Sequence, residues 1–522
     1  MSRRARDLAA DERSAPGVQD IAPVDGRRIR HFILSALSLL FVFTAATSQS
    51  ALAQQPGDAA AGPQLAAAIE QTLVEVIAAT EKSVVAIARV SQQEDGADDW
   101  PQPLDPFARF RQLEEATTPE DPDFIPTAFG TGVVIDRQGL ILTQQHLLRA
   151  GDTHWVTTAD RRVLKATIKA ADPRSGLAVL SVEANDLVPM PLGNAEKVRK
   201  GQFVVALGNP YAIARDGQAS ASWGIVANVA RKAAPTPADR SATDAQDTLH
   251  HFGTLIQTDA RLNVGTSGGA LVNLRGEMIG LTTSLAAIAG YEQSAGYAVP
   301  VDDTFRRVIQ TLMEGREVEY GFLGISPQNL PPRDARLGKA GMLVADVVEG
   351  TPAAAAGLQA GDVITHVNDL AIFGRDGLML QVGKQPAGRV VRLRYVRNEQ
   401  VGEVEVELAK NAVSQGMIAT QKPPAWRGLR VDYTTALSQY VEHLRLGDVD
   451  PQGCVAISDV EEGSPAWQQG LRPRMFISHV NDTRVRRPSD FRDAVTGQGG
   501  PVRLRLTTAA DNQAVRVIPP EA

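Results

Sequence analysis

Two segments in the last third of the chain repeat one another, and this repeat limits the possible folds more than any other feature. Residues 347–372, VVEGTPAAAAGLQAGDVITHVNDLAI, align without gaps with residues 460–485, VEEGSPAWQQGLRPRMFISHVNDTRV, at a constant offset of 113 residues. In each copy a proline suits the first turn of a helix, and Gly-Leu suits its C-terminal cap. A strand and an HVND turn follow. The repeat therefore predicts two related α+β modules, residues 317–410 and 427–522, joined by a Pro-rich linker at 411–426.

Residues 67–316 show a different pattern, in which short apolar runs alternate with turn residues. Examples are GTGVVIDRQGLILTQQHLL, QFVVALGNPY and GEMIGLTTS. Many short strands at such intervals are typical of an all-β barrel or sandwich rather than of a parallel sheet. We expect a helix over 302–314 at the end of this region. The acidic, Pro-rich stretch 91–126 indicates an inserted surface loop, and the Ala/Gly/Pro/Gln-rich residues 54–66 indicate a tether.

The N-terminus has the pattern of an export signal. Three arginines between residues 27 and 30 precede the apolar run 32–46, and Ala51-Leu52-Ala53 follows as a small-residue cleavage site. The pattern predicts a signal peptide with a long leader at residues 1–53, a mature protein that begins at Gln54, and a location in the periplasm or cell envelope. The apolar run is short for a membrane span. The alternative is an uncleaved anchor, which would associate the protein with the membrane.

Composition excludes several classes of function. The net charge is −7 and no basic stripe stands out, so we expect no nucleic-acid partner. A single cysteine, Cys454, makes an internal disulfide impossible. The eight histidines show no ligand spacing with cysteines or carboxylates. We therefore expect no metal and no other cofactor.

The sequence GTSGG at 265–269 is the first candidate for chemistry. Glycines on both sides of Ser267 let the backbone turn sharply, and the amides of Gly265 and Ser267 could point at a developing oxyanion. The same letters also suit an ordinary hairpin turn. His146, which ends a strand pair about 120 residues earlier, would supply the base that a serine hydroxyl needs. A histidine after a buried strand is, however, more often a hydrogen-bonded core residue.

Taken in order, these blocks resemble the HtrA (DegP-like) serine proteases. The matching blocks are GTGVVIDRQGLILTQQHLL, DPRSGLAVL, LGNPY, IQTDARLNVGTSGGALVNLRGEMIGL and GYAVP, and the resemblance covers nearly everything after residue 65. It implies a mainly β fold, with a chymotrypsin-like pair of six-stranded β-barrels followed by two α+β PDZ domains. It also implies an endopeptidase for unfolded or damaged envelope proteins, in which His146 is the general base and Ser267 the nucleophile. The amides of Gly265 and Ser267 would form the oxyanion hole.

The resemblance assigns peptide binding to the first module. YGFLGI at 320–325 is similar to the carboxylate-binding loop of the first PDZ domain. A polypeptide with an exposed C-terminus is therefore expected to add there as a strand, on the residues Phe322, Leu323, Gly324 and Ile325. The second module has Arg474-Met475 where the first has Gly361-Asp362, and only RGLRVDY precedes it. We expect the second module to be mainly structural or regulatory.

The inserted loop carries a further likeness to the family. Its DPFARF sequence, with Phe107 and Phe110, is similar to the long loop that joins family members into trimers. The resemblance therefore implies a trimer-based homo-oligomer.

One block departs from the family pattern. Family members carry an aspartate immediately before LAVL, which orients the histidine, and this chain has Gly176 there. Asp172 lies four residues upstream and is not expected to replace it, and Ser175 could bond to the ring but brings no charge. In a complete triad, replacing the acid by its amide lowers kcat by roughly 10⁴. Two hypotheses follow: an impaired Ser-His endopeptidase, or a non-catalytic peptide-binding chaperone or scaffold.

Overall fold

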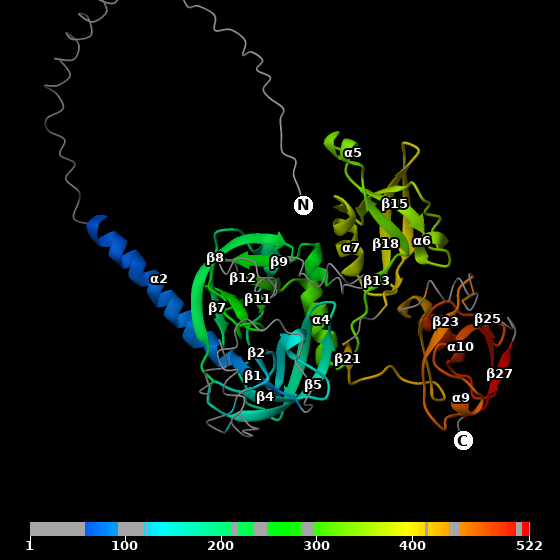
Figure 1. Cartoon of the computed structure of the whole chain (residues 1–522), viewed down its shortest axis with the longest axis horizontal. Coiled ribbons are helices and arrows are strands. Elements are labelled where there is room, and N and C mark those ends of the chain that lie inside the picture. The colour runs from blue at the N-terminus through cyan, green and yellow to red at the C-terminus, as the bar shows by residue number, and fades with distance from the viewer. Residues whose placement is uncertain are drawn as a thin grey trace, which may run out of the picture. The chain divides into compact units, whose positions relative to one another are not determined.

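The computed structural model (Figure 1) describes residues 58–91, 120, 124, 126–209, 217–232, 248–283, 296–412, 416–437, 440, 449–450, 452–507 and 514–520. The expected signal peptide lies outside the described residues, and so do Phe107 and Phe110. Among the helices of the described ranges, none is long and apolar enough to cross a membrane.

The first described element is helix α2 (Asp58–Thr80), which begins inside the segment that was expected to be a tether. That expectation is wrong for residues 58–66. The segment is rich in alanine, the residue with the highest helix propensity, and the helix continues through Pro63. A short 3-10 turn, η1 (Glu81–Ser83), leads from the helix into the first strand.

Six strands form a first closed barrel. They pair in the order β5-β4-β1-β2-β3-β6, and an additional pairing of β5 with β6 closes it. Side chains such as Ile87, Ile141 and Leu180, each 2% exposed or less, fill its interior. The strands are β1 (Val84–Val90), β2 (Ala128–Val134), β3 (Leu140–Gln144), β4 (Thr153–Thr157), β5 (Val163–Asp172) and β6 (Leu177–Val182).

A seventh strand, β21 (Ile418–Ala419), joins this barrel from a segment that was expected to be only a linker (Figure 1). It pairs antiparallel with the end of β5, with Ile418 opposite Ala171. Strand β4 pairs only with residues 163–166 of β5, so the end of β5 leaves an edge that β21 fills. Ile418 also packs against the core of the barrel.

A second closed barrel follows, with the strand order β10-β11-β12-β9-β8-β7. The fold is therefore the expected pair of six-stranded barrels. Helix α4 (Asp303–Met313) comes next, and the Asp302 side chain caps it by accepting a hydrogen bond from Phe305 N at 2.8 Å. The strands are β7 (Phe203–Gly208), β8 (Ser220–Arg231), β9 (Leu255–Thr258), β10 (Ala270–Asn273), β11 (Met278–Thr283) and β12 (Gly296–Pro300).

The two C-terminal modules have matching sheets. The first contains β14 (Ile325–Asn329), β15 (Met342–Val347), β16 (Val363–Val367), β18 (Val390–Arg397) and β19 (Gln400–Glu407), paired in that order, with helices α6 (Pro352–Ala355) and α7 (Arg375–Gly383). The second contains β22 (Leu429–Tyr433), β23 (Val455–Val460), β24 (Phe476–Val480), β26 (Val502–Thr507) and β27 (Val515–Ile518), with α9 (Pro465–Gln468) and α10 (Pro488–Val495). Each module has its own apolar core.

The HVND turns show how closely the two modules repeat one another. Asn368 and Asn481 both have left-handed backbones, with φ of 52° and 53°. Each asparagine side chain accepts a 3.0 Å hydrogen bond from a backbone amide, of Arg392 in the first module and of Arg503 in the second. Asparagine tolerates this backbone better than most residues. The sequence repeat is therefore a structural repeat down to single hydrogen bonds.

Candidate active site

His146 and Ser267 meet between the two barrels. His146 lies in the 3-10 turn η3 (Gln145–Leu147), directly after β3, and Ser267 lies in the loop before β10. The Ser267 Oγ is 3.2 Å from His146 Nε2. The two residues that the sequence singled out are thus within hydrogen-bonding distance of each other. A serine hydroxyl beside a neutral imidazole is the basic arrangement of an activated nucleophile.

The loop that carries Ser267 has a shape that only glycines allow. Gly265 has φ of +93° as the third residue of a turn in which Thr266 N bonds to Asn263 O at 3.1 Å, as in a type II turn. A Cβ on Gly268 would lie 2.1 Å from the carbonyl oxygen of Thr131. Within the described residues, the amides of Gly265 and Ser267 donate no hydrogen bond. Both remain available to a negatively charged oxygen.

Thr131 braces this loop, and sequence reasoning did not single it out. Its hydroxyl donates to the carbonyl of Gly265 at 2.7 Å and accepts from the amide of Asn209 at 2.8 Å. Its own amide donates to the carbonyl of Ser267 at 2.9 Å. Strand β2 of the first barrel therefore fixes the nucleophile loop of the second. The GTG sequence around Thr131 was the available signal, because flanking glycines permit this close approach.

The pKa of His146 is set by burial. Burial lowers its pKa from 6.5 to about 4, and no carboxylate acts in the opposite direction. Among the described residues, the only hydrogen-bond contact of the ring is that of Nε2 with Ser267, and the far nitrogen Nδ1 has none. The imidazole is neutral at pH 7 and can accept a proton. A base of so low a pKa is weak, because general bases act best with a pKa near the working pH.

Gly176 lies directly before β6 and has no side chain. Its φ is +70°, and its carbonyl accepts a 2.7 Å hydrogen bond from Gln145 N, next to the histidine. A Cβ at this position would lie 3.4 Å from both Gln144 Oε1 and His250 Nε2. The loop therefore still supports the turn that holds His146, through its backbone alone.

Asp172 is turned away from the histidine. It is buried, and its carboxylate accepts hydrogen bonds from the Tyr320 hydroxyl and from Ser175 N, the latter at 3.0 Å. Burial raises its pKa. Ser175 does not reach the ring of His146 either, because its hydroxyl donates to the Asp172 carbonyl at 3.4 Å and accepts from Leu177 N at 3.3 Å. Neither neighbour replaces the missing acid.

His250 is a second residue that the sequence did not reveal. It lies in the 3-10 turn η7 (Leu249–Phe252), is 3% exposed, and donates from Nε2 to the Ser175 carbonyl at 2.7 Å. Its Nδ1 is 3.2 Å from the Thr254 hydroxyl. Burial lowers its pKa from 6.5 to about 4. His250 therefore holds the 172–176 loop in place as a neutral side chain.

The expected peptide loop of the first module is also open. Leu323 and Gly324 lie between β13 (Gly321–Phe322) and β14, and their amides donate no hydrogen bond within the described residues. Gly324 has φ of +87°, and a Cβ there would lie 2.2 Å from Thr351 Cβ. Ile325 begins β14, which is an edge strand of its sheet. Free amides beside an open edge suit the terminal carboxylate of an added strand.

The second module has the same loop, contrary to the sequence expectation that none precedes it. A Cβ on Gly428 would lie 2.1 Å from Ser464 Cβ, which matches the relation of Gly324 to Thr351. Here, however, Leu429 N donates to Trp426 O at 2.9 Å. The Arg427 guanidinium donates to three backbone carbonyls, those of Gln498, Gly500 and Ile518. The amides of Arg427 and Gly428, like those of Leu323 and Gly324, donate no hydrogen bond within the described residues.

Among the residues that the structure describes, no three His, Cys, Asp or Glu side chains gather closely enough to hold a metal ion. The groups that the structure brings together at this site are a hydroxyl, a neutral imidazole and two amides that donate no hydrogen bond within the described residues.

Comparisons with known proteins agree with this arrangement. Residues 130–281 match the trypsin-like peptidase domain, and residues 321–408 and 457–508 each match a PDZ domain. The chain is 30% identical over 415 residues to a probable periplasmic serine endoprotease, DegP-like, of Chlamydia trachomatis serovar D, covering 78% of this chain and 77% of that protein. It is 29% identical to the periplasmic pH-dependent serine endoprotease DegQ of Escherichia coli, covering 91% of this chain and 96% of that protein. The solved structure of the HtrA-type protease AlgW with decapeptide aligns at 26% identity and a TM-score of 0.47, over 67% of this chain and 98% of that chain.

Proposed function

Because this chain belongs to the HtrA (DegP-like) family of serine endoproteases, we propose that it cleaves unfolded or damaged proteins of the cell envelope with a Ser267–His146 pair, at a reduced rate. The observation that carries the proposal is the 3.2 Å contact between Ser267 Oγ and His146 Nε2, beside two amides without partners. Those groups suffice for acyl transfer, since a nucleophile, a base and oxyanion donors are all present.

The steps follow from the positions of these groups. Ser267 Oγ attacks the scissile carbonyl while His146 Nε2 takes the hydroxyl proton, and the amides of Gly265 and Ser267 bind the oxyanion that forms. His146 then gives the proton to the leaving amine, and water repeats the sequence on the acyl-enzyme. Gly176 supplies no charge to stabilise the imidazolium, whose formation is already disfavoured by burial. The reduced rate comes from this step.

Labelling with a fluorophosphonate tests the proposal directly. The probe should modify the native chain slowly and should not modify Ser267→Ala. The same pair of proteins should differ in the hydrolysis of unfolded casein. Equal behaviour of the two proteins in both assays, with the fold intact, would leave the non-catalytic chaperone or scaffold as the function. That alternative has one observation in its favour: among the residues that the structure describes, no carboxylate interacts with His146.

We also propose that the first module captures polypeptides through a free, apolar C-terminus. The free amides of Leu323 and Gly324, and the edge strand that begins at Ile325 beside Phe322, support this mode. Peptides with a free carboxylate should bind more tightly than their amidated forms. Equal affinities would exclude the mode. The second module, whose Arg427 guanidinium is bound to three carbonyls of its own module, would serve a structural or regulatory role.

Location and assembly complete the proposal. Relatives named as periplasmic proteases support export of this chain, with cleavage before Gln54. N-terminal sequencing of protein from fractionated cells decides between this and an uncleaved anchor.

The loop that contains Phe107 and Phe110 is proposed to join subunits into trimers. Alanine at both positions should lower the sedimentation coefficient of the assembly, and a monomeric native chain at micromolar concentration would refute the idea.

A further inference from the structure

Part of the segment between the two C-terminal modules lies beside the turn that carries His146. Residues 416–421 form a strap along the first barrel, in which β21 is the paired part. A Cβ on Gly416 would lie 3.3 Å from Gln145 Nε2, so the strap passes close to the side chain that precedes the histidine. Gly416 has φ of +87°, a backbone that glycine adopts without strain. One end of the strap therefore borders the catalytic turn.

The rest of the strap holds the end of β5. Strand β21 pairs with residues 170–171 of β5, and the Thr420 hydroxyl donates to the Lys169 carbonyl at 2.8 Å. The half-buried side chain of Ile418 packs against the apolar core of the first barrel, to which Leu147 of η3 also belongs. The strap thus contributes to the packing of both β5 and η3.

These contacts affect the histidine because its backbone is its main support. The 172–176 loop follows β5, and the Gly176 carbonyl in it accepts a 2.7 Å hydrogen bond from Gln145 N. In a complete triad a carboxylate also orients the ring. Among the described residues, however, the only hydrogen-bond contact of the His146 ring is that with Ser267. A shift of β5 or of η3 would therefore move the ring, since no acid holds it in place.

The second module holds the chain that directly follows the strap. Arg430 Nε donates to the Pro423 carbonyl at 2.7 Å, and Lys422 Nζ forms an ion pair with Asp459 at 3.0 Å. Both Arg430 and Asp459 belong to the sheet of the second module. A displacement of that module would consequently pull on the strap.

We infer that the strap positions His146 for catalysis, and that the second module controls the rate of proteolysis by keeping the strap on β5. Ile418 and Thr420 are then positioning residues, which fix the backbone that carries the base. A strap that leaves β5 lowers the rate, because a misplacement of about 1 Å can cost roughly 10²-fold. This inference rests on the proposed proteolysis by Ser267 and His146 and adds its regulation.

Saturation kinetics of fluorophosphonate labelling test the inference on the full chain. Thr420→Val removes the hydroxyl that donates to Lys169, and Ile418→Ala removes most of the side chain that packs on the barrel. Each should lower the maximal rate of labelling of Ser267 by roughly tenfold, while the half-saturating concentration of the probe stays the same. Thr420→Ser keeps the hydroxyl and should be labelled at nearly the native rate.

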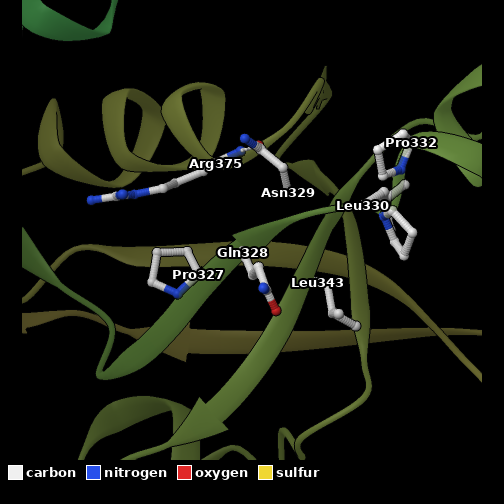
Figure 2. A pocket seen from close by; sticks show the side chains of 8 residues that line it. Pro327, Gln328, Asn329, Leu330, Pro332, Leu343 and Arg375 are labelled. Carbon is white, nitrogen blue, oxygen red and sulfur yellow. Dashed lines mark hydrogen bonds between the residues drawn. The ribbon is translucent and has the colours of Figure 1, made fainter. Parts of the chain in front are cut away.

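Two more variants complete the set. Leu343→Ala is the matched control for Ile418→Ala, because Leu343 is also a half-buried aliphatic residue of a strand. Figure 2 shows it at a pocket of the first module, and its loss should leave the labelling rate unchanged. Arg430→Ala releases the Pro423 carbonyl and should slow labelling, as Thr420→Val does.

The histidine ring provides a readout that needs no activity. In NMR spectra of protein with isotope-labelled histidine, the signal of His146, assigned with His146→Gln, should shift in Thr420→Val and Ile418→Ala. It should stay in place in Leu343→Ala. If the native chain is labelled no faster than Ser267→Ala, the proposed proteolysis is wrong. The NMR signal then decides on the strap alone, and an unchanged signal in both strap variants would overturn its role.

If the native chain is labelled, the rates decide. A native rate in both Thr420→Val and Ile418→Ala would overturn the inference, and so would equal losses in Ile418→Ala and Leu343→Ala. A native rate in Arg430→Ala beside a slow Thr420→Val would remove the control by the second module.

Discussion

Gly176→Asp should raise the rate of proteolysis by about 10²-fold. A complete triad gains roughly 10⁴ in kcat from the charge of its acid, which sets the ceiling. The backbone at position 176 is left-handed, with φ of +70°, a conformation that aspartate tolerates better than most residues. A Cβ there fits, at 3.4 Å from Gln144 Oε1 and His250 Nε2. The Gln144 Oε1 is itself an acceptor and would repel the new carboxylate, and the His250 Nε2 proton already goes to the Ser175 carbonyl. A misplacement of about 1 Å can remove 10² of the gain.

The pH profile gives a second measure of the same change. The pKa of His146 is about 4, so in the native chain the base is neutral and active down to acidic pH. A carboxylate beside the ring favours the imidazolium and raises this pKa. The acidic limb of kcat/KM should therefore move to higher pH in Gly176→Asp, while the maximal rate rises.

The assay is casein hydrolysis together with the rate of fluorophosphonate labelling, each with Ser267→Ala as the background. Gly176→Asn has nearly the shape of the aspartate without its charge and should gain little. A folded Gly176→Asp protein with an unchanged rate would refute the reasoning, and so would an asparagine variant as fast as the aspartate.

Three further substitutions test the supports of the site. Thr131→Val leaves the Gly265 carbonyl and the Asn209 amide without their partner. It should lower the free energy of unfolding in urea by about 1–3 kcal/mol and slow the labelling of Ser267. An unchanged labelling rate would mean that the Thr131 hydroxyl does not support the Ser267 loop. His250 is neutral in the native state with a pKa of about 4 against 6.5, so the unfolded chain binds more protons between those pH values and stability rises with pH there. His250→Gln should reduce that rise by up to about 3 kcal/mol, and an unaltered pH dependence of urea unfolding would contradict it. Tyr320→Phe removes a donor from the buried carboxylate of Asp172 and should lower stability by about 1.5–3 kcal/mol. The same loss in an Asp172→Ala background, which has no side-chain acceptor, would mean that the hydrogen bond is not the cause.

Local pattern was enough to predict an all-β barrel or sandwich and the repeated modules, and the resemblance to the HtrA family implied the pair of barrels and the approach of His146 to Ser267. Each of these depends on a periodic run of apolar residues or on a glycine-rich motif. His250 could not be found in that way, because an isolated polar residue has no periodicity and its partner Ser175 lies 75 residues away in the sequence. The hydrogen bond between Asp172 and Tyr320 could not be predicted either, since the two residues lie 148 positions apart in the sequence.

Strand β21 shows a different limit. Its two residues, Ile418 and Ala419, have no strand pattern of their own. They pair with β5 because β5 extends beyond the end of β4, which leaves the backbone of Ala170 and Ala171 without a strand on that side. The start of α2 was missed for the opposite reason, since an alanine-rich segment that looked like a tether has enough intrinsic preference to be a helix.

The pairing of β21 with β5 also joins the first barrel to a segment far along the chain. Thr420 Oγ1 donates to the carbonyl of Lys169 at 2.8 Å, across 251 residues of chain. Without residues 418–420, the backbone at Ala170 and Ala171 would be open to strands of other chains. A chain cut after residue 410 would keep that edge open, so a fragment that ends at residue 421 should stay soluble where the shorter one aggregates.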